Sequence, residues 1–365
     1  MVSKNGKYAV TYFIVAYGNE SIGVAKKIED QIAAWTAKKL EILLFVVTDT
    51  VGAEVWKKID AKSKILVEKK GILRYFSRTL FLYLAKRETQ EILYIRETFP
   101  IPYLRMKKGP RWILEVQTIQ QNELKLRSIF RLKLYRFLQK SWNSKFEGVV
   151  FVSNELSQLL KNSYKKSQSI VISNGINLTR YSEKPLIRNE NGLQFLFIGS
   201  LDQEWQGTDQ LIELAAVMPN VKFNLIGPTI SNLKAPENVV FHGLLNTEQY
   251  SAIASKCRLA FGTLNQQVTG MNEASPLKVR EYLALGLPVV IRYIDTDFQA
   301  DHHFILKIPI DSRRLVEYKK EIIEFSSRWA DKRVSESEIA PFISVNGKEH
   351  DRLAFFDRIL TEERR

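Results

Sequence analysis

Short apolar runs alternate with amphipathic stretches along the whole chain of 365 residues. The runs have the length of buried strands, and the stretches between them repeat with the period of a helix. The predicted strands are Val10–Ala16, Leu40–Val47, Ile92–Arg96, Ile113–Gln117, Gly148–Val152, Ser169–Ile172, Leu193–Ile198, Val221–Ile226, Val239–Phe241, Leu259–Gly262, Pro288–Ile291 and Phe304–Ile308. Predicted helices lie between them, for instance Ile22–Lys38, Asp209–Ala216 and Thr247–Lys256. This alternation is typical of parallel α/β sheets.

Each half of the chain predicts its own doubly wound, Rossmann-like α/β domain, and the length is sufficient for two cores. The polar stretch 182–192 has the composition of a linker. We therefore expect a first domain over residues 1–181 and a second over residues 193–344. The tail has no strand left to add, but its amphipathic pattern predicts a helix. We expect this helix, within residues 345–365, to return to the first domain.

Composition limits the classes of protein that the chain can be. Apolar residues make up 45% and charged residues 26%, as in a folded protein. The single cysteine excludes an internal disulfide, and the four histidines have no recognisable metal-ligand spacing. Lys4 and Lys7 precede an apolar stretch, as in a signal peptide, but the chain continues into a helix pattern. We read the stretch as a first strand and expect a cytoplasmic protein.

The basic charge is confined to the first half. Residues 1–180 contain 32 Lys and Arg against 15 Asp and Glu, whereas the remainder contains 22 against 25. Such a field attracts nucleic acid, anionic lipid or phosphorylated substrates. Two stretches, Lys125–Lys140 and Ile72–Lys86, carry basic and apolar residues at helical spacing. They fit helices packed on the sheet, or peripheral docking on an anionic membrane surface, which we hold as a hypothesis.

The segment richest in candidate chemistry combines a predicted helix start with two carboxylates. Ser275 followed by Pro276 predicts a hydroxyl cap and a first helical residue, and Gly286 predicts the helix end. The helix follows the carboxyl end of a strand, where free backbone N–H groups favour an anion such as a diphosphate. We expect Glu273 in the loop just before the helix, and Glu281 on the helix. The two carboxylates can accept hydrogen bonds from different hydroxyls of one ligand.

The spacing of Glu273 and Glu281 resembles the donor-site motif of the family-4 retaining glycosyltransferases with the GT-B fold. The stretches Ser153–Leu156, Ser173–Ile176, Trp205–Ile212, Phe223–Gly227 and Val239–Gly243 resemble further elements of that family. The resemblance covers nearly the whole chain, most clearly residues 149–298. It implies two Rossmann-like domains facing a cleft. It also implies transfer of a sugar from a nucleoside diphosphate-sugar to a glycan or lipid-linked glycan, with retention of configuration and without metal or cofactor.

The resemblance also implies roles for individual residues. Glu273 would hold the hydroxyls of the donor sugar, Lys278 would add positive charge at the reacting diphosphate, and Glu281 would hold the ribose. The remaining donor-side residues are Gly199, Ser200, Gln206, Gly227, Ala274, Ser275, Pro276 and Leu277. The backbone N–H groups of Ala274, Ser275 and Leu277 would meet the diphosphate, whereas proline has no N–H to offer.

On the acceptor side, the sequence after the first strand resembles the glycine loop of the family. Gly18 and Gly23 would form this loop, although an ordinary turn from strand to helix fits the same residues. Arg96 and Gln117 each lie at the carboxyl end of a predicted strand and would reach the acceptor. A surface arginine is the alternative reading of Arg96.

The sequence departs from the family at the positions that usually carry positive charge. Ser200 and Gln206 stand where many relatives have arginine and lysine, and Gln117 stands where they often have histidine. The missing charge would have to come from another part of the chain. The candidates are Lys278, Arg280, Arg292 and a lysine of the first domain.

Two other functions remain open at this stage. The neutral Ser200 and Gln206 fit a catalytically silent subunit that binds a sugar or a partner. A nucleic-acid-binding protein would explain the basic half, but no recognition motif is visible and Glu273 and Glu281 would have no purpose. The sequence Asp295–Asp297 has the form of a metal-binding Asp-x-Asp, yet its position after a strand predicts a turn. We therefore expect no metal and no nucleic acid.

Overall fold

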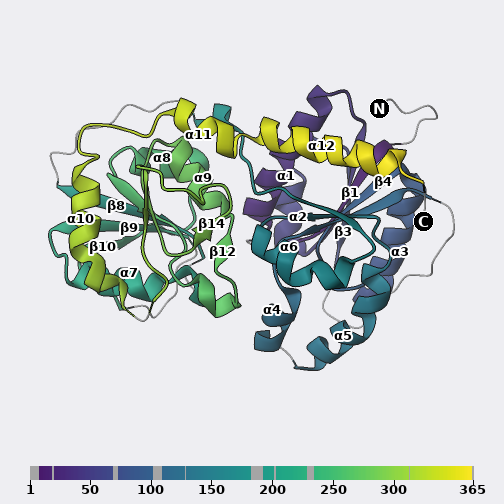
Figure 1. The fold of residues 1–365 in the computed structure, drawn as a ribbon, viewed down its shortest axis with the longest axis horizontal. Helices are drawn as coiled ribbons and strands as arrows, with labels where there is room; N and C mark the ends of the chain where they lie inside the picture. The colour runs from purple at the N-terminus through teal and green to yellow at the C-terminus, as the bar shows by residue number, and fades with distance from the viewer. Residues whose placement is uncertain are drawn as a thin grey trace. The chain divides into compact units, whose positions relative to one another are not determined.

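The computed structural model forms two compact α/β units (Figure 1). It describes residues 8–18, 20–68, 73–101, 109–127, 129–181, 192–200, 203–227, 234–311 and 313–363. Unit 1 takes its residues from 1–173 and 345–365, and unit 2 from 174–344. The predicted linker 182–192 lies outside the described residues except for Gly192.

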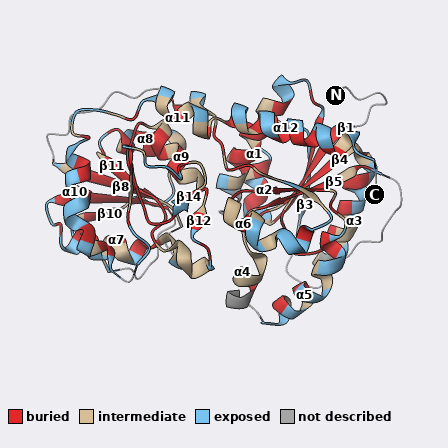
Figure 2. Ribbon diagram, in the orientation of Figure 1, coloured by how far each residue is buried: buried red, intermediate tan, exposed pale blue. Residues whose placement is uncertain are grey.

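Unit 1 is built on a parallel sheet of seven strands in the order β3-β2-β1-β4-β5-β6-β7. The strands are β1 (Tyr8–Val15), β2 (Ile42–Thr48), β3 (Ser63–Val67), β4 (Thr89–Arg96), β5 (Arg111–Val116), β6 (Gly148–Phe151) and β7 (Gln168–Val171). The central strands are almost entirely buried because helices cover both faces (Figure 2). The sequence prediction omitted β3, a short edge strand whose first two residues are exposed.

The helices of unit 1 are α1 (Glu20–Ala37), α2 (Thr50–Trp56), α3 (Leu73–Glu88), α4 (Gln120–Arg127), α5 (Ile129–Asn143), α6 (Asn154–Leu160) and α12 (Val345–Thr361), with a 3₁₀ turn at Lys161–Tyr164. The basic stretch Lys125–Lys140, predicted as one helix, is divided between α4 and α5. No helix within the described ranges is long and apolar enough to cross a bilayer.

A buried polar network holds α12 against α1 and the sheet. Glu349 accepts hydrogen bonds from the Gln31 amide (3.1 Å) and the Trp35 indole (2.7 Å), both on α1. Arg352, one turn further along α12, pairs with Glu349 at 2.8 Å and with Glu115 of β5 at 3.5 Å. Lys27 also pairs with Glu115, at 2.9 Å. All these side chains are buried, so each charge depends on its partners.

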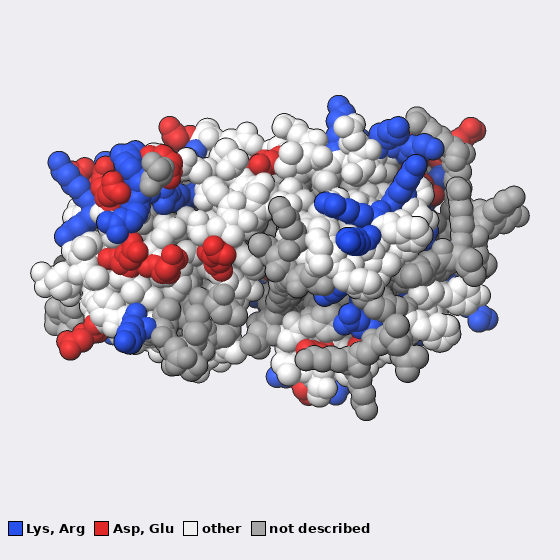
Figure 3. Space-filling model, turned by 90° about the horizontal axis from the view of Figure 1, so that it is seen from below, with Lys and Arg blue, Asp and Glu red and all other residues white. Residues whose placement is uncertain are grey.

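The charge difference between the halves persists in the folded units. Figure 3 shows a face on which Lys and Arg side chains gather over unit 1, while acidic and basic side chains lie together over unit 2. The basic excess is therefore a property of unit 1 and its surface. It does not extend over the whole molecule.

Unit 2 contains a parallel sheet of six strands in the order β10-β9-β8-β11-β13-β15. The strands are β8 (Leu193–Ile198), β9 (Val221–Ile226), β10 (Val239–Phe241), β11 (Leu259–Phe261), β13 (Val289–Ile291) and β15 (Ile305–Lys307). A separate parallel pair joins β12 (Glu273–Ala274) to β14 (Ile294–Asp295). The two large sheets confirm the prediction of two Rossmann-like α/β domains.

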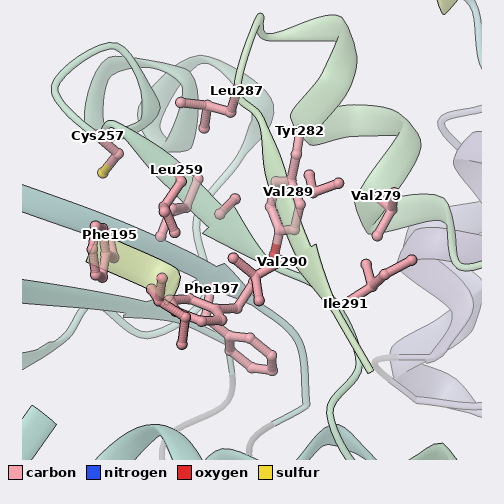
Figure 4. Packing of buried hydrophobic residues seen from close by; sticks show 14 of the residues in the cluster. Phe195, Phe197, Cys257, Leu259, Val279, Tyr282, Leu287, Val289, Val290 and Ile291 are labelled. Atoms are coloured by element: carbon pink, nitrogen blue, oxygen red, sulfur yellow. The ribbon is translucent and has the colours of Figure 1, made fainter. Parts of the chain in front are cut away.

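The helices of unit 2 are α7 (Thr208–Ala216), α8 (Thr247–Ala254), α9 (Leu277–Ala284), α10 (Lys319–Ser327) and α11 (Glu336–Ile343). Short 3₁₀ helices lie at Leu178–Tyr181, Glu204–Gln206, Gln266–Thr269 and Leu315–Tyr318. Figure 4 shows how α9 packs: Val279 and Tyr282 point into the core toward Val289 and Val290 of β13. The core thus fixes the apolar face of α9.

The boundary between the units lies earlier than residue 181, where the sequence analysis placed it. The segment from Asn174 to Tyr181 belongs to unit 2. Asn174 donates from its backbone N–H to the Ser275 hydroxyl (2.8 Å), and the Tyr181 hydroxyl donates to Glu281 (3.0 Å). These contacts join residues about a hundred positions apart, so the local sequence gives no sign of them.

We expect Arg352→Leu to lower the free energy of unfolding by about 3–5 kcal/mol, because it leaves Glu115 and Glu349 buried without their shared cation. Denaturant unfolding followed by far-UV circular dichroism measures the change. Arg358→Leu is the matched control, since Arg358 lies on the exposed side of the same helix. Equal stability of the two variants would show that the network contributes nothing to the docking of α12.

Candidate functional site

Two glycines meet at the carboxyl ends of β8 and β9. Gly227 has a φ of +151°, and a β-carbon at this position would lie 1.8 Å from the carbonyl oxygen of Gly199. The backbone at Gly199 is also tied to β9, since its N–H donates to the Ile226 carbonyl at 2.9 Å. Only glycine permits this approach of the two chains. Gly199 and Gly227 thus form a surface of bare backbone, the glycine floor, at the carboxyl edge of the sheet. This is where α/β domains bind ligands.

Lys278 lies over this floor. A β-carbon on Gly199 would be 2.9 Å from the ammonium nitrogen of Lys278 and 3.0 Å from the amide oxygen of Gln206. The ammonium donates to that amide oxygen and lies 4.1 Å from the centroid of the Phe197 ring. Burial lowers the pKa of Lys278 to about 7. The structure therefore brings together four of the predicted donor-side residues, Gly199, Gln206, Gly227 and Lys278.

The predicted cap of α9 is wrong. The helix begins at Leu277, and Pro276 takes the cap position with an extended backbone and no capping side chain. The Ser275 hydroxyl accepts instead from the Asn174 backbone, and the Ser275 carbonyl accepts from the Asn174 side chain at 2.5 Å. The Ser275 hydroxyl, which the local pattern assigns to the helix cap, is thus used in a tertiary contact with Asn174. The first turn of α9 is left without a side-chain cap.

The end of α9 agrees with the prediction. Gly286 follows the last turn with a φ of +76°, and its N–H donates to the Leu283 carbonyl at 2.9 Å. The helix is eight residues long. Tyr282 joins it to β8, because its hydroxyl accepts from the Ile198 N–H at 2.6 Å. The residue before Gly199 is therefore fixed to the same helix that carries Lys278.

The two glutamates of the motif have different surroundings. Glu273 is buried on the short strand β12, whereas the sequence analysis placed it in a loop. Glu281 is partly buried on α9 and accepts from the hydroxyls of Tyr181 (3.0 Å) and Tyr250 (3.4 Å). The sequence analysis missed both tyrosines, which come from other elements.

Arg280 does not supply charge to a ligand. Its guanidinium is completely buried and binds both carboxylate oxygens of Asp295 (2.5 and 2.7 Å) and one of Asp297 (2.5 Å). It also donates to the Asn174 carbonyl at 3.3 Å. The neighbouring carboxylates raise the pKa of Arg280 against the effect of burial. The Asp-x-Asp sequence is therefore neither a metal site nor a simple turn, but the partner of a buried arginine.

Arg292 is likewise committed to structure. Its guanidinium donates to the Pro309 carbonyl (3.1 Å), the Gln210 amide oxygen (3.1 Å) and the Asp311 carbonyl (2.8 Å). Of the three second-domain candidates for the missing positive charge, Lys278 lies beside Gly199 and Gln206, whereas the Arg280 guanidinium is held by Asp295 and Asp297. Ser200 directly follows Gly199, and its carbonyl accepts from the Gln203 N–H at 3.1 Å. Ala274 lies on β12 and Leu277 opens α9.

The predicted acceptor-side residues lie at one edge of the unit 1 sheet, with one exception. Gly18, Arg96 and Gln117 follow or end the adjacent strands β1, β4 and β5. Gly18 has a φ of +53° and donates to the Asp49 carboxylate at 3.0 Å. The Arg96 Nε and the Gln117 side-chain nitrogen are buried without a hydrogen-bond partner. Gly23 departs from the prediction because it lies within α1, and not in the loop.

The part of the chain that the structure describes contains no group of three or more His, Cys, Asp and Glu side chains arranged to hold a metal ion. Cys257 is buried, and burial raises the pKa of its thiol to about 12. His303 pairs with Glu338 on the surface at 3.2 Å. Neither residue joins a cluster with the chemistry of a site.

We expect Gly227→Ala to lower the free energy of unfolding by about 3 kcal/mol or more, because the added carbon meets the Gly199 carbonyl and the backbone strain adds to the clash. Gly23→Ala is the matched control: Gly23 is an exposed helix residue with nothing within 4 Å of an added β-carbon. That change should stabilise by about 0.5–1 kcal/mol. Thermal unfolding of both variants measures the difference, and a harmless Gly227→Ala would contradict the close approach.

No protein-family model matches the chain, and no curated protein matches its sequence. Solved structures do match. The glycosyltransferase HepE of Anabaena, in complex with UDP and glucose, superposes with a TM-score of 0.67 at 14% identity, over 96% of this chain and 99% of that one. Sucrose-phosphate synthase of Thermosynechococcus elongatus gives 0.66 at 13% identity, over 96% and 98%.

The pneumococcal O-GlcNAc transferase GtfA, in complex with UDP and GlcNAc, gives a TM-score of 0.65 at 10% identity, over 97% of this chain and all of that one. At these identities the likeness concerns the fold. Each of these structures is matched over nearly its full length, so the likeness extends to both units of the chain. The chain therefore has the GT-B fold of these glycosyltransferases.

Proposed function

We propose that the chain is a glycosyltransferase that uses a nucleoside diphosphate-sugar as donor and a glycan or lipid-linked glycan as acceptor. We further propose that it acts without a metal, with retention of anomeric configuration, in the cytoplasm. The observation that carries the proposal is the convergence of Lys278 with Gly199, Gly227 and Gln206 beside the uncapped start of α9. UDP is the first nucleotide to test, because the HepE and GtfA structures contain it.

In this proposal the diphosphate lies at the glycine floor, beside the side chains of Lys278 and Gln206. Lys278 and the backbone N–H groups of Ala274, Ser275 and Leu277 would meet its oxygens. When the bond between the sugar and the diphosphate breaks, negative charge grows on the departing phosphate. A cation and oriented N–H groups stabilise that charge, and they do so more strongly in a partly buried site than in water.

The two glutamates are assigned to the hydroxyls at either end of the donor. Glu281 would accept from the ribose, with its carboxylate held in orientation by Tyr181 and Tyr250. Glu273 would accept from the sugar. The acceptor would meet residues at the carboxyl ends of the unit 1 strands, where Arg96 and Gln117 have buried nitrogens without partners.

Lys278 makes donor binding dependent on pH. Its pKa of about 7 means that the ammonium is charged below pH 7 and loses its proton as the pH rises. The affinity for UDP-glucose should therefore be highest below pH 7 and fall by up to about tenfold per pH unit above it. UDP-glucose is the suitable probe because its diphosphate diester stays ionised from about pH 6 to about pH 9. Isothermal titration calorimetry across this range measures the profile.

The control for this prediction is Lys278→Gln, which removes the titrating group. It should weaken binding at pH 6 by about 10- to 100-fold and leave a flat profile, since a charge-assisted hydrogen bond is lost. A wild-type protein with a flat profile would exclude Lys278 as the cation of the site. A failure to bind any nucleoside diphosphate or its sugar would contradict the proposed function itself.

A catalytically silent subunit is the second candidate, favoured by the neutral Ser200 and Gln206. Glu273→Ala separates the two functions. In a transferase, this variant should bind UDP while donor hydrolysis falls by about a hundredfold or more. Asn272→Ala is the matched control, since Asn272 is the exposed neighbour of Glu273. Nucleotide binding with equal, undetectable turnover in wild type and Glu273→Ala across a panel of donors would establish the silent subunit.

A further inference from the structure

Helix α3 turns an apolar face outward. Phe76 is 74% exposed, and Leu80, Tyr83 and Leu84 are also exposed. These positions recur at intervals of three and four residues, so they form one stripe along the helix. A helix on the surface of a soluble protein normally has its polar residues on this side. The outward side of α3 is therefore apolar, where that of a surface helix is normally polar.

Two of the cations of α3 lie on its inner side instead. Arg78 is buried, pairs with Glu68 at 2.8 Å and donates to the Tyr17 hydroxyl. Lys86 is buried as well. The helix thus buries two of its cations, whereas several of its large apolar side chains face solvent. Arg87, the exposed cation of α3, lies directly after the apolar stripe.

Helix α5 adds exposed aromatic and basic residues. Phe137 is 81% exposed and Phe130 is 75% exposed, and Ile129 is exposed beside them. Lys133, Arg136 and Lys140 are exposed on the same side of the helix, at intervals of three and four residues. The opposite side is fixed to the protein, with Leu132, Tyr135 and Trp142 buried.

The two helices lie on one face of the unit 1 sheet. The connection from β3 to β4 carries α3, and the connection from β5 to β6 carries α4 and α5. Both connections cross the sheet in the same direction. Right-handed crossovers in one direction place their helices on the same face. The helices α1 and α2 belong to crossovers in the opposite direction and cover the other face, as Figure 1 also shows.

We propose that this outer surface of α3 and α5, the α3–α5 face, docks on an anionic lipid bilayer. Its charge is complementary to such a membrane: α5 contains no acidic residue, and the one in α3, Glu88, is paired with Lys64. The large apolar side chains enter the boundary between headgroups and acyl chains, while the neighbouring lysines and arginine meet the lipid phosphates. The proposal concerns where the protein acts and does not depend on the assignment of the donor site.

A bilayer fits these residues better than a protein partner does. Phenylalanine rings that stand out singly between cations, as in α5, suit a fluid surface that closes around each ring. A stable protein interface would need a packed apolar core with few charges. The basic excess of unit 1 also favours a bilayer, since its electric field attracts the unit to an anionic surface.

Flotation of the full chain with vesicles tests the proposal. We expect binding to vesicles of phosphatidylcholine containing phosphatidylglycerol, little binding to phosphatidylcholine alone, and weaker binding at high salt. The double variant Phe130→Ser with Phe137→Ser should reduce binding to the anionic vesicles by about tenfold or more. The control is Val51→Ser, an exposed apolar residue of α2 on the other face of the sheet, with 58% exposure.

A second pair of variants tests the charge. Lys133→Gln with Arg136→Gln and Lys140→Gln should weaken binding by roughly fivefold for each cation removed. Lys38→Gln with Lys39→Gln and Lys58→Gln removes the same charge from exposed positions after α1 and α2, and should have a much smaller effect. Equal effects of the two triple variants would overturn the proposal and leave only a non-specific attraction.

Two further measurements keep the outcomes distinct. All variants should keep the unfolding temperature and the UDP affinity of the wild type, so that loss of vesicle binding is not loss of the fold or of the donor site. Sedimentation shows whether the face joins two copies of the chain. A dimer that Phe130→Ser with Phe137→Ser dissociates, together with no vesicle binding by the wild type, would overturn the proposal.

Discussion

The arrangement of the candidate site depends on one buried ion cluster, the guanidinium of Arg280 with Asp295 and Asp297. Arg280 lies on α9, whereas Asp295 ends β14 and Asp297 follows it. The guanidinium also donates to the carbonyl of Asn174. The cluster thus joins α9 to two other segments of the chain. A buried charge of this kind is costly unless every partner is present, so the cluster admits few alternative arrangements. Glu273 lies on β12, which pairs with β14, and Ser275 and Lys278 lie at the start of α9.

In the proposed donor site, Lys278 would supply the positive charge that the neutral residues at 200 and 206 lack. Its ammonium lies against Gln206 and the Phe197 ring. The same enclosure lowers the pKa of Lys278. A cation that is partly desolvated before the ligand arrives can interact strongly with a diphosphate, at the expense of being charged over a narrower range of pH.

The two units handle their charges differently. Unit 2 buries Arg280 and Arg292 among its own hydrogen-bond acceptors, and its charge is nearly balanced. Unit 1 buries the network around Glu115 and Arg352 that attaches α12, and leaves much of its basic excess on the surface. On α3 and α5 this surface combines with exposed aromatic residues. A donor site in one unit and a membrane-facing surface in the other would suit an acceptor that is anchored in lipid.

The sequence by itself determined the elements and their class. The mainly apolar runs Leu193–Ile198 and Val221–Ile226 became strands with the predicted bounds, because phenylalanine, isoleucine and valine favour a buried strand. Gly286 ended its helix as predicted, because a left-handed residue after a helix favours glycine. The spacing of Glu273 and Glu281 could also be read directly. These features are local, and local sequence carries the physics that produces them.

Only the tertiary structure decided which polar groups pair. Ser275 has the local pattern of a helix cap, but Asn174 takes its hydroxyl. Arg280 and Lys278 are two positions apart on one helix, yet one is neutralised by Asp295 and the other lies beside Gly199. The outward stripe of α3 has the same helical period as an inward one, and only burial shows its direction. Partners about a hundred residues away leave no trace in a local pattern, because the fold alone brings them within reach.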